Sequence, residues 1–111
     1  MKTYSLNVGI DELNAHQQRQ ADLVVRLDYP RFCKINPGDR ISLRSNGKLH
    51  PLKRRVVAVR VYDHLANLAK SEKLRRIHPG MDLDNLREKI RYWRRTYLGT
   101  PKLLVFELAD L

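Results

Sequence analysis

The segment INPGDRISLRSNG, residues 35–47, decides which fold class the sequence favours, because it contains a turn, a strand and a second turn. The Pro-Gly pair at 37–38 predicts a tight turn, since proline fixes its φ angle and glycine accepts a positive one. In residues 40–44 apolar and polar side chains alternate, which is typical of a half-buried strand. The Asn-Gly pair at 46–47 is the dipeptide that two-residue hairpins prefer. The centre of the chain therefore predicts short strands joined by tight turns.

Outward from this segment, the sequence predicts four more strands and three helices. The strands are expected over 3–8, 23–27, 53–62 and 101–108, and the helices over 11–19, 64–69 and 82–97. The last helix has the clearest pattern, with apolar side chains three and four residues apart and Asp82 placed to cap it. This order predicts an α+β fold built on a small mixed β-barrel with two to three helices. With 111 residues and no linker or repeat, residues 1–111 are expected to form one domain.

Composition excludes several classes of protein. The longest apolar runs, such as residues 56–59, are far shorter than the roughly 20 residues that span a bilayer. The first residues lack the apolar core of a secretory signal. Cys33 is the only cysteine, which rules out an internal disulfide and fits a reducing compartment. We therefore expect a soluble, cytoplasmic domain with no membrane partner.

Positive charge is concentrated in the middle of the chain. The net charge is +10, and residues 31–60 carry nine basic residues and a single acid, Asp39, for a net of +8. Such density costs self-repulsion in a folded protein, so solubility alone explains it poorly. A polyanionic partner offsets this cost, and a nucleic acid is the first candidate.

Motifs for catalysis, metals and cofactors are weak by comparison. The four histidines do not pair with a cysteine or an acid at metal-ligand spacing, so no metal is expected. Neither glycine-rich phosphate-binding motif occurs, so no nucleotide cofactor is expected. Cys33 lies between two basic residues, which would favour its thiolate, yet a single free thiol is usually incidental. The basic residues of the last helix fall largely opposite its apolar stripe and are interpreted as a solvated face.

Several stretches together resemble the ASCH domain family, a branch of the PUA-like β-barrels. VRLDYP (25–30) resembles the arginine-bearing second strand of the family, and INPGDRISL (35–43) is similar to its turn and following strand. HPGM (78–81), the helix after it and LVFEL (104–108) resemble its closing helix–strand unit. The resemblance covers nearly the whole chain. It implies a PUA-like fold and RNA binding in a cleft on one side of the barrel.

One departure from the family concerns its chemistry. The family signature is Gly-x-Lys-x-x-Glu-x-Arg. This chain has Arg19, Ala21 and Val24 in place of its Gly, Lys and Glu, and only its arginine is present, as Arg26. A branch that hydrolyses N4-acetylcytidine is expected to use that lysine, the carboxylate or a threonine, and a later glutamate that falls near Pro79 here. Neither Ala21 nor Val24 can transfer a proton. No catalytic residue is therefore assigned.

We expect a single-domain RNA-binding protein, with DNA as a possible partner and the oligomeric state left open. The resemblance implies that Arg26 lies at the floor of the cleft. Residues 53–55 would hold phosphates, and two tyrosines would stack or line the cleft. The predicted binding residues are Arg26, Tyr29, Arg31, Lys53, Arg54, Arg55, Tyr97 and Lys102. The alternatives are an enzyme that processes RNA or modified nucleosides, such as a ribonuclease or an N4-acetylcytidine amidohydrolase, and a protein-interaction module.

Overall fold

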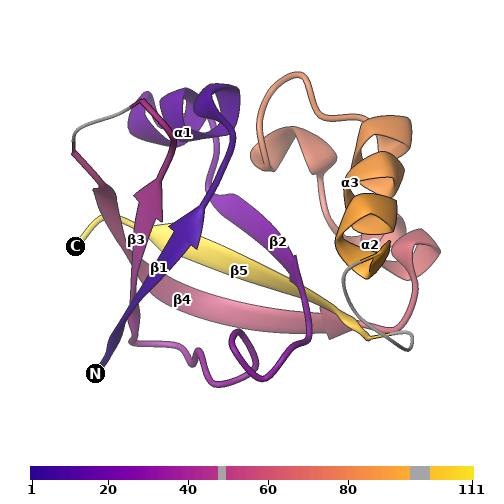
Figure 1. Cartoon of the computed structure of the whole chain (residues 1–111), viewed down its shortest axis with the longest axis horizontal. Coiled ribbons are helices and arrows are strands. Elements are labelled where there is room, and N and C mark those ends of the chain that lie inside the picture. The colour runs from indigo at the N-terminus through magenta and orange to yellow at the C-terminus, as the bar shows by residue number, and fades with distance from the viewer. Residues whose placement is uncertain (48–49, 96–100) are drawn as a thin grey trace.

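The structure is a computed structural model that describes residues 1–47, 50–95 and 101–111 (Figure 1). Its strands are β1 (Thr3–Asn7), β2 (Leu23–Leu27), β3 (Arg40–Arg44), β4 (Leu52–Tyr62) and β5 (Leu103–Ala109). Its helices are α1 (Ile10–Gln17), α2 (Leu65–Ser71), the short 3-10 helix η1 (Leu74–Arg76) and α3 (Leu83–Arg95). None of the described helices is both long enough and apolar enough to cross a bilayer.

The five strands form one mixed sheet in the order β1-β3-β4-β5-β2. Strands β1 and β3 are parallel, whereas the other neighbouring pairs are antiparallel. The sheet curls strongly into a half barrel, so that its two edge strands, β1 and β2, come to the same side of the molecule (Figure 1). The expected α+β class and small mixed barrel are confirmed.

Apolar side chains pack in two layers, one on each face of the curled sheet. The inner layer fills the half barrel and includes Val24, Ile41 and Phe106. The outer layer lies between strands β2 and β5 and the helices α2 and α3, and it includes Val25 and Ile90. Strand β5 contributes to both layers, which explains its nearly continuous apolar sequence, since successive side chains point to opposite faces.

The predicted helices and strands agree with the structure apart from small shifts at their ends. The 3-10 helix η1 was not predicted, and residues 45–51 connect β3 to β4, so the two-residue hairpin predicted at 46–47 is wrong. Helix α3 begins at Leu83, and the Asp82 carboxylate caps it by accepting a hydrogen bond from the backbone N–H of Asn85 at 2.8 Å. Leu83, in the first turn of α3, is 37% exposed, whereas Leu86 and Ile90 on the same stripe are buried. The predicted C-terminal end of this helix, with Tyr97, falls outside the described residues.

Candidate nucleic-acid interface

Arg26 lies at the seam where the curled sheet brings its two edges together. It follows Val24 on the inner face of β2, and its guanidinium donates hydrogen bonds to the backbone oxygens of Val25 and of Asn7 at the end of β1. The guanidinium carbon also lies 5.4 Å from the ring centroid of Trp93 on α3. A single side chain thus connects β2, β1 and α3.

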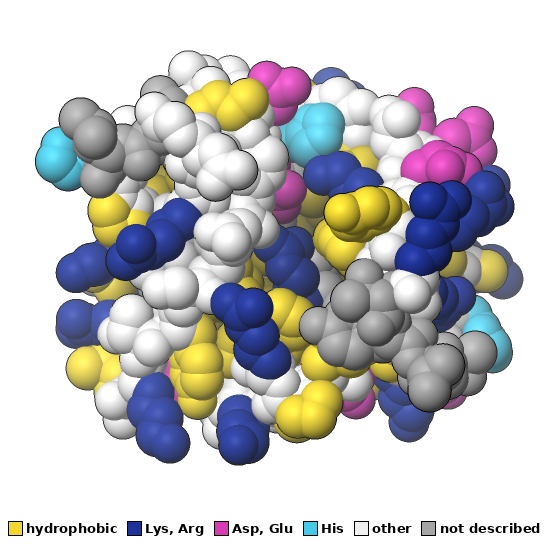
Figure 2. All heavy atoms as spheres, viewed as in Figure 1, with side chains coloured by type: hydrophobic (Ala, Val, Ile, Leu, Met, Phe, Trp, Pro, Cys, Tyr) yellow, Lys and Arg dark blue, Asp and Glu magenta, His cyan; other side chains and the backbone are white. Residues whose placement is uncertain are grey.

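A cavity of about 390 Å³ opens beside Arg26, between the β1–α1 junction and helix α3. Its walls include Glu12, Arg26, Glu88, Lys89, Tyr92 and Trp93. Figure 2 shows basic and hydrophobic side chains around the hollow between the two halves of this face. The volume falls within the range of about 300–1,000 Å³ that is usual for small-molecule sites. The site therefore combines cations, carboxylates and aromatic rings around a space large enough for a small planar ligand.

Glu12 is the most buried charged group of the cavity, with 4% of its surface exposed. Its carboxylate lies 3.8 Å from the ammonium group of Lys89, a distance that makes an ion pair but is too long for a hydrogen bond. Burial raises the pKa of Glu12, while the positive charges of Arg26, Lys89 and His78 oppose that rise. Burial lowers the pKa of Arg26, and the negative charge of Glu12 opposes this change. For both groups the effect of burial exceeds that of the opposite charges nearby.

A second basic feature lies on the outer face of β3 and of the first residues of β4, away from the helices that pack on the other end of β4 (Figure 1). Arg40 lies directly opposite Arg55, and Lys53 lies opposite Ser42, in the β3–β4 register. We call Arg40, Arg44, Lys53 and Arg55 the basic strip. Among the described residues, no acid lies within ion-pairing distance of these four side chains. Like charges placed opposite one another destabilise a sheet, so the strip favours a bound anion.

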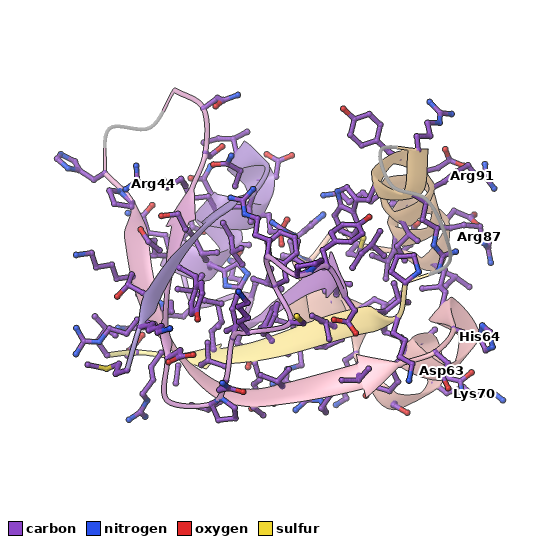
Figure 3. All side chains as sticks on the ribbon, turned by 60° about the horizontal axis from the view of Figure 1, so that its bottom comes forward. Arg44, Asp63, His64, Lys70, Arg87 and Arg91 are labelled. Atoms are coloured by element: carbon purple, nitrogen blue, oxygen red, sulfur yellow. The ribbon has the colours of Figure 1, made fainter. Side chains whose placement is uncertain are left out.

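The basic residues of α3 lie elsewhere and already have partners. Arg87 pairs with Asp84 at 3.1 Å, and Arg91 pairs with Glu88 at 2.8 Å, each within one turn of the helix. Figure 3 shows Arg87 and Arg91 projecting from α3 on the opposite side of the molecule from Arg44. These pairs fit the interpretation of this face as solvated.

The structure separates the eight predicted binding residues into several groups. Arg26 lines the cavity, and Lys53 and Arg55 belong to the basic strip. Arg31 is exposed near β1, where it donates a long hydrogen bond of 3.5 Å to the backbone oxygen of Ser5. Tyr97 lies outside the described residues.

Three of the predicted residues are committed to other contacts. Arg54 points inward, where it donates to the backbone oxygen of His16 at 3.3 Å and lies 3.6 Å from Asp110, because it falls on the inner face of β4. Tyr29 does not line the cavity. Its ring belongs to the outer core layer, and its hydroxyl bonds the backbone oxygen of Trp93. Lys102 pairs with Asp63 at 3.5 Å.

Sequence reasoning missed Glu12 and Lys89 as site residues. In the sequence, Glu12 is an ordinary first-turn acid of a helix, and Lys89 is one of several bases on an amphipathic helix. Only the tertiary fold, which places α1 and α3 on either side of the cavity, brings them together. Within the described residues, no group of three or more His, Cys, Asp or Glu side chains is placed to hold a metal ion.

Comparison with known proteins identifies the fold. No protein-family model and no curated protein sequence matches the chain. Among solved structures, the hypothetical protein PH0355 is 21% identical over the whole of both chains, with a TM-score of 0.75. Protein PF0455 from Pyrococcus furiosus is 27% identical, with a TM-score of 0.67, and covers 98% of this chain and 97% of its own.

The third similar structure is a mutant of ZmASCH, from Zymomonas mobilis. It is 14% identical, with a TM-score of 0.66, over 97% of this chain and 68% of that protein. At this identity the likeness establishes the fold alone. The half barrel and the helices on its outer face thus agree with the resemblance seen in the sequence, and the chain has an ASCH-like fold.

Proposed function

We propose that this chain is a cytoplasmic RNA-binding protein in which the basic strip holds the phosphate backbone and the cavity beside Arg26 receives a base. The observation that carries the proposal is the basic strip, whose four cations lie on an uncovered sheet face with no acid in ion-pairing distance among the described residues. Phosphates are the ligands that such a set of cations attracts, and the attraction does not depend on sequence.

The cavity lies at the end of this strip, which supports one continuous path for a strand of RNA. Asn7 is opposite Arg44 in the β1–β3 register, and the same Asn7 lines the cavity. Tyr92 and Trp93 form part of the cavity wall, and base stacking on an aromatic ring contributes roughly 1–3 kcal/mol per base. In this arrangement the cavity would contribute base stacking, and the basic strip would neutralise the charge of the phosphates.

Fluorescence-anisotropy titration of labelled single- and double-stranded RNA and DNA, over a series of salt concentrations, tests this proposal. If four phosphates are contacted, the logarithm of the binding constant should fall with the logarithm of salt concentration with a slope of about −3 for a single strand. Reversing Lys53 and Arg55 to glutamate should weaken binding and flatten the slope. The matched control reverses Arg87 and Arg91, which changes net charge equally on the helix face and should have a much smaller effect. A flat slope for the unaltered protein, or equal losses in the two double variants, would contradict the proposal.

A second candidate function, hydrolysis of RNA or of a modified nucleoside, is favoured by the pairing of Glu12 with Lys89. The family signature has its lysine and carboxylate just before the arginine, where this chain has Ala21 and the fully buried Val24. Here a carboxylate from α1 and an ammonium group from α3 line the same cavity as the arginine instead. Turnover of RNA or N4-acetylcytidine that disappears in Glu12→Gln would favour the enzyme over the binding protein.

A further inference from the structure

Glu12 lacks the hydrogen-bond donors that a buried carboxylate ordinarily has. An ionised carboxylate offers about four acceptor positions, and buried charges in proteins are normally both paired and hydrogen-bonded. Over residues 1–47, 50–95 and 101–111, no donor lies within hydrogen-bond distance of the Glu12 carboxylate, and its nearest charged neighbour is Lys89 at 3.8 Å. Because Glu12 also lines the cavity, a ligand in the cavity can reach this unused acceptor capacity.

The surrounding charges define what kind of group Glu12 would accept. Burial raises the pKa of Glu12, and the positive charges of Arg26 and Lys89 oppose that rise by favouring the ionised form. An ionised carboxylate only accepts hydrogen bonds, so its partner must present N–H or O–H groups and no lone pair at the point of contact. The two cations, in turn, suit an acceptor oxygen on the same ligand.

The aromatic residues of the cavity favour a flat ligand. Tyr92 is 68% exposed although it is a large aromatic side chain, and it lines the cavity next to Trp93. A planar heterocycle laid against Tyr92 would cover apolar surface that is now open to water. Trp93 is already in contact with the guanidinium of Arg26, which holds that cation at the cavity wall.

We propose that the cavity selects a guanine base, whose adjacent N1–H and N2–H donors bind the Glu12 carboxylate side by side. The inference rests on the proposed RNA binding and deepens it. Guanine alone among the four bases presents two neighbouring donors on its pairing edge. Adenine and cytosine place an acceptor nitrogen beside their amino group, and uracil places its single N–H between two carbonyl oxygens, which a carboxylate repels. The O6 atom of guanine lies next to N1–H and is the kind of acceptor that the cationic groups of the cavity wall bind.

The test uses single-stranded oligouridylates of nine nucleotides in which only the central position is varied. The central nucleotide is uridine, guanosine, adenosine, cytidine or inosine, and binding is measured by fluorescence anisotropy at one salt concentration. The guanosine oligonucleotide should bind most tightly. Inosine lacks the N2 amino group, so it should bind about tenfold more weakly than guanosine, as expected for the loss of one hydrogen bond to a charged group. The inosine comparison uses the unaltered protein and needs no variant to fold.

Glu12→Gln should abolish the preference for guanosine over inosine and uridine. A carboxamide has one acceptor and one donor end, so it cannot accept two neighbouring N–H groups. The control Glu88→Gln removes an equal charge from the rim of the same cavity and should keep the preference. Equal affinities for the guanosine and inosine oligonucleotides, or a preference that survives in Glu12→Gln, would overturn the guanine assignment. Salt-dependent binding of oligouridylate with no gain from guanosine would overturn this inference alone, whereas the absence of binding to all five would overturn the proposed function as well.

Discussion

Acid should destabilise this protein in part through one histidine, His16, which lies buried at the end of helix α1 with 1% of its surface exposed. Its Nε2 atom lies 3.1 Å from the backbone oxygen of Leu23. Since a carbonyl oxygen only accepts, the neutral ring donates from Nε2. Protonation at Nδ1 would place a positive charge in the core, and Arg54 adds further repulsion. Burial is the main cause that lowers the pKa of His16 to about 4.

The size and sign of the effect follow from this value. An unfolded histidine has a pKa near 6.5, so between about pH 6.5 and pH 4 the unfolded chain binds more protons at this site than the folded protein does. The contribution of His16 to stability is therefore complete at pH 7 and falls as the pH is lowered. By pH 4 the loss amounts to about 3 kcal/mol, which is a large part of the stability of a small domain. Glu12 acts in the opposite sense, because a carboxyl pKa that is raised in the folded state favours folding at low pH.

The assay is urea unfolding at pH 7, 6, 5 and 4 of the unaltered protein, of His16→Gln and of His50→Gln. Glutamine keeps a donor near the Leu23 oxygen and does not titrate, so the difference between the two proteins isolates His16 from Glu12 and the other acids. The unaltered protein should lose about 3 kcal/mol relative to His16→Gln between pH 7 and pH 4. His50 is exposed, and its variant should follow the unaltered protein at every pH. A difference between the unaltered protein and His16→Gln that stays constant over this range would refute the reasoning.

Two further predictions concern stability at neutral pH. Arg19 has a φ angle of +61° just after helix α1, at the position where the family signature has glycine, and its ion pair with Asp110 is mostly exposed. Arg19→Gly should therefore raise the free energy of unfolding by up to about 1 kcal/mol, while Arg19→Ala should give no gain. Glu72 is buried and accepts hydrogen bonds from Arg60 and Tyr62, so Glu72→Ala should lower the free energy of unfolding by about 2–3 kcal/mol. The control Asp84→Ala breaks an exposed ion pair on α3 and should lower it by less than about 0.5 kcal/mol. Urea unfolding at pH 7 measures both, and a loss in Arg19→Gly or equal costs for Glu72→Ala and Asp84→Ala would count against the respective argument.

Local patterns predicted most helices and strands because apolar side chains recur every second residue in a half-buried strand and every three or four residues in a helix. The alternation in residues 40–44 and the three-and-four spacing in α3 identify a strand and a helix without knowledge of the rest of the fold. The parallel pairing of β1 with β3 has no such local signal, since it joins segments more than 30 residues apart and depends on how the whole sheet curls.

The candidate site was less predictable because it depends on which faces meet. Arg26 could be placed by its position in a recognisable strand, whereas Tyr29, which was expected at the cleft, is covered by the outer core layer. Trp93 packs partly against the same layer and also lines the cavity. Glu12 and Lys89 meet only through tertiary packing, and no spacing in the sequence connects residues 77 positions apart.

The bond from Arg26 to the Asn7 oxygen has a consequence for motion. Between β1 and β2 the sheet has no described backbone ladder, and this side-chain bond joins the two edges across the gap. Opening the seam therefore requires the loss of far fewer hydrogen bonds than opening any ladder of the sheet, so amide hydrogen exchange should be fastest along the outer edge of β1. A ligand that takes the N–H group now bonded to Asn7 would release the edge of β1. Ligand binding in the cavity should therefore change the rate of amide hydrogen exchange at the edge of β1.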